Sequence, residues 1–118
     1  KDTLEYNQMM KGAYKMKMSK TFYGGAIIDS KDSREFDLGY RIILQYYKTC
    51  NSLMVKEENT YGVEIVKTEQ KGEEIKTEIK DINNITTSEE VADKILEMLT
   101  NYKVTPITAT EIIEDFIK

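Results

Sequence analysis

The chain has 118 residues, a length typical of a single domain, and folding at this size buries about 65% of the surface of the unfolded chain. With no histidine and one cysteine, it cannot form a histidine-dependent nucleophile system, an intrachain disulfide or a structural zinc site on its own. The formal net charge of −4 is uneven. Residues 1–48 carry nine Lys/Arg against six Asp/Glu, and residues 49–118 carry eight against fifteen. The acidic second part disfavours a broad surface for polyanions.

The sequence favours a cytoplasmic location. It has no apolar run of the length that a membrane span needs and no apolar core of a signal peptide. The chain does not begin with methionine, so we expect a segment to have preceded Lys1, and a removed signal peptide is the alternative.

The N-terminal part combines two signals. Asp2 and Glu5 resemble a capping box, which with Gly12 predicts a short helix within residues 2–12. Residues 14–18 then alternate between Tyr or Met and Lys, which predicts a half-buried strand with its lysines in solvent. An alternative function for this part is nucleic-acid binding, because aromatic side chains beside lysines suit base stacking combined with phosphate contact. The candidate contacts are Lys11, Lys15, Lys17 and Lys20, interleaved with Tyr14, Phe22 and Tyr23.

Residues 24–39 contain a glycine pair followed by a polar segment. Gly24-Gly25 predicts a turn or a bulge, since no phosphate-binding glycine motif follows it. Residues 29–39 predict a polar loop. Its carboxylates could form a calcium or magnesium site, but their spacing does not match an EF-hand, and we interpret them as a solvated loop. These carboxylates are Asp29, Asp32, Glu35 and Asp37.

Two further segments predict the rest of a sheet. Residues 40–48 form a nearly continuous apolar run, typical of a central strand that is covered on both faces. Residues 60–82 alternate as a hairpin. Tyr61, Val63 and Ile65 share one face of its first strand, and Ile75 and Ile79 share one face of its second. Aligning these sets requires an odd loop, Gln70-Lys71-Gly72, with Gly72 at positive φ and Val63 opposite Ile79.

Two helices are predicted after the hairpin. Thr87 and Glu90 form a capping box, and an apolar arc follows within residues 91–102. Its members are Val91, Ala92, Ile95, Leu96, Met98, Leu99 and Tyr102. Pro106 stops this helix, and Thr108 with Glu111 predicts the cap of a second one. The second helix has an apolar stripe of Ala109, Ile112, Ile113, Phe116 and Ile117. Its other face carries Glu111, Glu114 and Asp115, which are either solvated residues or candidates for binding a partner.

Residues 60–118 resemble an uncharacterised domain-of-unknown-function family of short proteins from low-GC Gram-positive bacteria. The resemblance rests on TYGVEI (60–65), KDINNITTSEEVADKIL (80–96) and VTPITATEIIEDFI (104–117). Members often have histidine at the position of Thr108, so no acid–base role is carried over to that residue. The resemblance implies no activity.

These patterns together predict an α+β fold, in which an antiparallel sheet of at least three strands carries two C-terminal helices on one face. The chain is expected to be a single domain, 1–118, with a divergent segment at 1–39 and a strand-strand-strand-helix-helix core at 40–118. We expect a non-enzymatic interaction or regulatory module without a cofactor, whose partner is another protein or a second copy of the chain. The alternatives are nucleic-acid binding and an enzyme that uses carboxylates or tyrosines.

Overall fold

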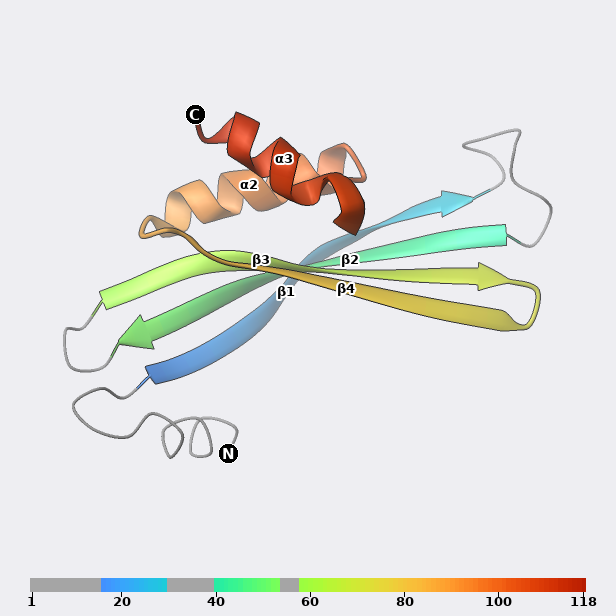
Figure 1. Ribbon diagram of the computed structural model, residues 1–118, viewed down its shortest axis with the longest axis horizontal. Helices are drawn as coiled ribbons and strands as arrows, with labels where there is room; N and C mark the ends of the chain where they lie inside the picture. Colours follow the sequence, from blue (N-terminus) through green and yellow to red (C-terminus); the bar gives the residue numbers. More distant parts are fainter. Residues whose placement is uncertain (1–15, 30–39, 54–57) are drawn as a thin grey trace.

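The computed structural model describes residues 16–29, 40–53 and 58–118. It has an α+β fold in which four antiparallel strands form a meander and two helices pack on one face of the sheet, as predicted (Figure 1). The elements are β1 (Met16–Asp29), β2 (Tyr40–Leu53), β3 (Glu58–Lys71), β4 (Glu74–Thr86), α2 (Glu89–Asn101) and α3 (Pro106–Phe116). The helix expected within residues 2–12 lies outside the described residues, and so does the loop expected at 29–39 apart from Asp29, which ends β1.

β1 confirms the strand expected from the alternation at 14–18 from Met16 onward and extends it to Asp29, while residues 14 and 15 lie outside the described part of the chain. The strand runs through Gly24-Gly25, and its register with β2 shifts between Phe22 and Gly24, which confirms the bulge. The burial expected for the apolar side of this strand is wrong at Met18, which is 42% exposed. Neither of the helices that the structure describes, α2 and α3, covers that side of the sheet, and β1 is an edge strand.

β2 is a central strand, as predicted, but the described part of the chain covers only one of its faces. Ile42, Leu44 and Tyr46 are buried beneath the helices, whereas Ile43 and Tyr47 point to the opposite face and are partly exposed. The prediction of cover on both faces is therefore wrong, because both helices lie on the same side of the sheet (Figure 1).

The β3–β4 hairpin corrects the predicted register. Lys71 pairs with Glu74, so the loop has two residues, and Gly72 lies first in it at φ 61°. Positive φ at the first loop residue is typical of a type II′ turn. This even loop places Val63 opposite Ile82, not Ile79, and leaves Ile75 and Ile79 more than half exposed on the face away from the helices. The expected positive φ at Gly72 is confirmed.

α2 is capped one residue later than expected. The N-cap is Ser88, whose side chain accepts a hydrogen bond from the Val91 amide. At the other end, Lys103 adopts φ 51° and the Val104 amide bonds to the Leu99 carbonyl, an arrangement that ends the helix as a Schellman motif. Tyr102 forms the C-cap beyond the apolar arc and is 76% exposed, so its predicted place on the arc is wrong.

α3 begins at Pro106, with Thr105 as its N-cap, so the cap predicted at Thr108 is wrong. Proline suits the first turn of a helix because its missing N–H would be unpaired there in any case. Ala109 and Ile113 are buried. Phe116, in the last turn, is 45% exposed because the C-terminus lies away from the sheet (Figure 1).

The core lies between the helices and one half of the sheet. It consists of Ile42, Leu44, Tyr46, Val63, Ile65, Ile95, Leu96, Leu99, Val104, Ala109 and Ile113. The Tyr46 hydroxyl crosses this core and donates a hydrogen bond of 2.8 Å to the Val104 carbonyl. Burial raises the pKa of Tyr46 well above its ordinary range, so this hydroxyl stays protonated. The β3–β4 turn extends beyond the helices (Figure 1).

Candidate interaction surface

The structure places two of the four candidate nucleic-acid contacts, Lys17 and Lys20, on β1. They stand three positions apart on a strand, so they point to opposite faces of the sheet. The Lys20 ammonium lies 4.9 Å from the centre of the Tyr47 ring and 3.3 Å from the Glu64 carboxylate. Lys11 and Lys15 lie outside the described residues. The two described lysines therefore do not form one basic patch.

The candidate acidic residues Glu111, Glu114 and Asp115 are all exposed on α3, as expected. Asp115 forms an ion pair with Lys118 at 3.6 Å, and both side chains are about four-fifths exposed. A fully hydrated carboxylate of this kind needs no partner to be stable. The structure thus brings these residues together on one solvent-exposed face of α3. No described contact links them to the sheet.

Polar clusters elsewhere offer little chemistry among the described residues. Groups of three or more potential metal ligands are absent from ranges 16–29, 40–53 and 58–118, while Asp32, Glu35 and Asp37 of the candidate metal loop lie outside them. A depression of about 470 Å³ near the β3–β4 turn is lined by Thr77 and four charged residues. Two of these, Lys67 and Glu78, pair with each other at 3.6 Å. The Tyr40 hydroxyl donates a hydrogen bond to the neighbouring Glu69 carboxylate, which raises the pKa of Tyr40.

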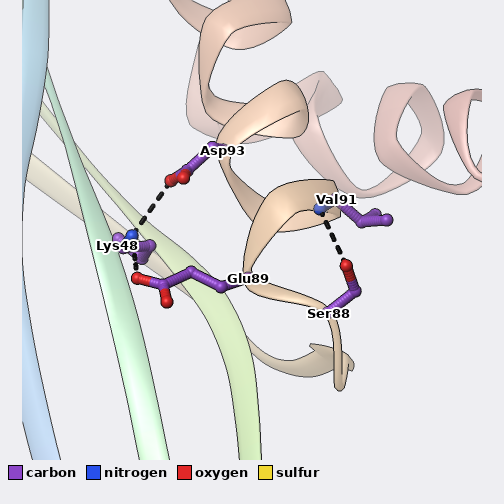
Figure 2. A network of polar contacts seen from close by, with 5 residues as sticks. All are labelled: Lys48, Ser88, Glu89, Val91 and Asp93. Carbon is purple, nitrogen blue, oxygen red and sulfur yellow. Dashed lines mark hydrogen bonds and ion pairs between the residues drawn. The ribbon is translucent and has the colours of Figure 1, made fainter.

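Lys48 connects the sheet to the first turns of α2. Its ammonium donates hydrogen bonds to Glu89 at 2.6 Å and to Asp93 at 3.0 Å, and Ser88 caps the same helix end (Figure 2). The hydrogen bond to Glu89 raises the pKa of Lys48, burial of the ammonium opposes this, and Asp93 adds to the rise. This network fixes α2 on its face of the sheet, so it is architectural.

The opposite face of the sheet carries a group of large apolar residues, and no element within residues 16–29, 40–53 and 58–118 covers it. Paired residues on neighbouring strands share a side, and the register pairs Phe22 with Tyr47, Ile27 with Ile43, and Val66 with Ile79. The even-numbered residues of β2 point to the helices, as the Tyr46 hydrogen bond demonstrates, so its odd-numbered residues point away from them. We call this side of the sheet the open face. Its large apolar residues are Met18, Phe22, Ile27, Ile43, Tyr47, Val66, Ile75 and Ile79.

Several apolar side chains of the open face are exposed to solvent in the single chain. Phe22, Ile27, Ile75 and Ile79 are between 49% and 63% exposed. The Phe22 and Tyr47 rings make an edge-to-face contact with centroids 5.5 Å apart, so they form one aromatic unit. Scattered exposed apolar residues are normal, but a contiguous patch over four strands is typical of an interaction site.

Sequence reasoning missed the open face. The sequence does not reveal that both faces of the sheet are apolar, because each strand contributes only a few apolar residues to the open face. The one available signal was that Ile75 and Ile79 fit a two-residue turn as well as an odd one. With the two-residue turn, they leave the side of Val63 and Ile65.

Residues 19–118 match the model of a family described as a family of unknown function (DUF6514). The match includes residues 60–118, on which the resemblance rests, and adds most of β1 and all of β2. No curated protein and no solved structure matches the chain. Within the described ranges, no helix has both the length and the apolar character needed to cross a membrane.

Proposed function

The chain belongs to the DUF6514 family of unknown function, and we propose that it is a non-enzymatic protein-interaction module that docks its partner on the open face. The observation that carries this proposal is the uncovered apolar sheet face opposite the helices, centred on Phe22, Val66 and Ile79. Burying apolar surface releases about 25 cal/mol for each Å² removed from water, so this face is the strongest source of binding free energy among the described residues.

The charges around the open face favour a protein partner over a nucleic acid. Lys20, the basic residue above the Tyr47 ring, is already paired with Glu64, and Asp81 follows Glu64 on the next strand. Binding along a phosphate backbone needs several unpaired cations on one surface. An apolar centre with a charged rim is instead the usual arrangement of a protein–protein interface.

The proposal is tested by comparing two double variants in affinity purification from cells of the source organism. Phe22→Ser with Ile79→Ser removes two anchors of the open face. Tyr102→Ser with Ile107→Ser removes two residues that are 76% and 78% exposed at the end of α2 and in α3. We expect the first variant to lose its bound protein at least tenfold and the second to retain it. Circular dichroism verifies that both fold.

Retention of every bound protein by the open-face variant would overturn the proposal. Loss from the Tyr102/Ile107 variant instead would place the interface on the helices. Binding of labelled DNA or RNA that survives the open-face changes but falls with Lys17→Gln would favour the nucleic-acid function.

A further inference from the structure

We propose that the occupant of the open face is a second copy of this chain, packed face to face with its strands running in the opposite direction. This inference rests on the proposed function and names its partner. The two-fold axis would lie between the two sheets, perpendicular to the strands, and pass beside Val66 and Ile79.

The apolar residues nearest this axis are arranged symmetrically about it, whereas Ile75, four positions from the central row on β4, has no apolar counterpart. The register places Gly25, Gln45, Val66 and Ile79 in one row across the four strands. The aromatic pair Phe22–Tyr47 lies on one side of this central row, and the aliphatic pair Ile27–Ile43 lies on the other. On β2, each pair is two residues from the centre, or about 6.6 Å along the strand.

When the strands of the second copy run in the opposite direction, apolar residues of one copy lie over apolar residues of the other. Phe22 then faces Ile27 of the second copy, Tyr47 faces its Ile43, and Ile79 faces its own counterpart. In the outer rows, Lys20 on β1 faces Asp29 of the second copy, and Thr49 on β2 faces its Arg41. A surface that matches itself in this way is what a two-fold interface requires.

The other face-to-face arrangement fits poorly. A two-fold axis parallel to the strands would place β1 over β4 and β2 over β3 of the second copy. The row that contains Phe22, Tyr47, Glu64 and Asp81 would then fold onto itself. Phe22 would cover Asp81, and Tyr47 would cover Glu64. Covering Asp81 with an aromatic ring removes its hydration without supplying a cation, which is costly, whereas Glu64 already has Lys20 beside it.

The size of the open face matches what a stable dimer needs. Three strands have 14 residues and the fourth has 13, which corresponds to a length of about 46 Å. Four strands at about 4.8 Å spacing give a width of about 19 Å, and hence a face of about 870 Å². A standard interface buries about 800 Å² on each partner. Gly25 in the central row leaves space for the aligned packing of two sheets about 10 Å apart.

Cysteine cross-linking tests the position of the axis. In a Cys50→Ser background, Ile79→Cys places a thiol beside the axis, and Lys80→Cys places one at the next position on the opposite face. With a short bis-maleimide, we expect Ile79→Cys to form covalent dimer at least tenfold faster than Lys80→Cys. A mixture of Phe22→Cys and Ile27→Cys chains should cross-link, whereas Phe22→Cys with Asp81→Cys should not. Equal rates at positions 79 and 80, or the reverse preference between the mixtures, would overturn the inference.

Light scattering on the unmodified chain provides the second measurement. We expect twice the mass of the 13.7 kDa chain for the wild type and for Lys80→Gln, and a single mass for Ile79→Glu, which sets two carboxylates against each other at the axis. A wild type that stays monomeric when its concentration is raised 100-fold above that of the first light-scattering measurement would overturn the second copy as partner. If the open-face double variant still lost a different bound protein, the proposed function would stand without this inference. If it lost none, both would fail.

Discussion

Gly62 lies where β3 passes closest to β4, next to the register shift between Tyr61 and Val63. A Cβ atom at this position would lie 2.3 Å from the Ile82 carbonyl oxygen and 2.9 Å from the Asn83 Cα. Both neighbours are backbone atoms, so the strand itself would have to move. The bulge that allows this approach includes Asn84, at φ 57°, whose side-chain oxygen accepts hydrogen bonds from Asn51 and Thr60.

Gly62→Ala is therefore expected to destabilise the fold by about 1–3 kcal/mol, the usual cost of forcing extra volume into a packed site. Urea unfolding followed by circular dichroism measures this free energy. The matched control is Gly24→Ala, whose Cβ atom would meet only Thr100 side-chain atoms at 3.9 and 4.0 Å, and it should change stability by less than about 0.5 kcal/mol. Equal effects of the two changes would contradict the backbone clash.

Two apolar residues of α3 should differ sharply in their contribution to stability. Ile113 is 2% exposed, whereas Phe116 is 45% exposed near the free end of the chain. Ile113→Ala is expected to cost about 2–5 kcal/mol, as for a buried aliphatic residue. Phe116→Ala should cost about 1 kcal/mol, since half of its surface is already in water. Chemical denaturation of both variants measures the difference, and a larger cost for Phe116 would mean that this side chain is covered in solution.

At the scale of elements, Lys48 holds α2 to β2 through two carboxylates of the first helical turns. Its pKa is raised in the folded state above the ordinary 10.5. A raised pKa means that the ion pairs stabilise the fold fully below the unfolded-state pKa, and that this contribution is lost as pH rises through the folded-state pKa. Both carboxylates are about half exposed, so the contribution is at most about 1 kcal/mol.

Lys48→Met keeps the aliphatic stem and removes the charge. We expect it to lower the free energy of unfolding by less than about 1 kcal/mol near neutral pH, with the deficit shrinking above pH 10.5 and in high salt. Thermal melts of both proteins across pH measure this difference. Lys94→Met is the control, because Lys94 pairs with Glu90 in solvent at 3.9 Å and should contribute less. A deficit that grows at alkaline pH would contradict the assigned sign.

The sequence identified elements whose signals are local. Alternation identified β1, β3 and β4, a continuous apolar run identified β2, and the apolar arc identified α2, because these patterns depend on residues close together in the sequence. The sequence analysis failed where two local structures fit the same residues equally well. Thr87 and Ser88 can both cap a helix, and Gly72 can take positive φ in a two-residue or a three-residue loop. The two loops place Ile75 and Ile79 on opposite faces of the sheet, so the choice between them depends on which face the rest of the chain covers.

At the scale of the whole molecule, the open face could not have been predicted from the sequence. It brings together Phe22, Tyr47 and Ile79 from three strands, and its composition depends on the register of every strand pair. The rule that apolar residues lie inside misled the hairpin prediction, because this sheet is apolar on both sides and only one is covered. Exposed apolar surface of this kind is informative only after the fold is known.

Stability should also be unequal along the strands. The fully buried strand residues of the core are Leu44, Tyr46, Val63 and Ile65, and burial decreases toward the β3–β4 turn, where Ile42, opposite Glu69, is 7% exposed. The β3–β4 turn, with residues 67–79 on either side of it, extends beyond the helices (Figure 1). Its side chains toward the helix side are Lys67, Glu69, Lys76 and Glu78, which contribute little burial. Segments with few buried apolar contacts open at free energies below that of global unfolding.

Native-state hydrogen exchange should reveal this gradient. At a concentration where light scattering gives a single chain, we expect hydrogen-bonded amides at 67–79 to exchange at least tenfold faster than those at 44–46 and 63–65. This ratio corresponds to a difference of about 1.4 kcal/mol in opening free energy. Association through the open face would cover Ile75 and Ile79 from the other side, so raising the protein concentration should slow exchange at 67–79 more than in the core. Uniform protection along the strands at low concentration would mean that the sheet opens as one unit, and that the helices stabilise it well beyond the residues they contact.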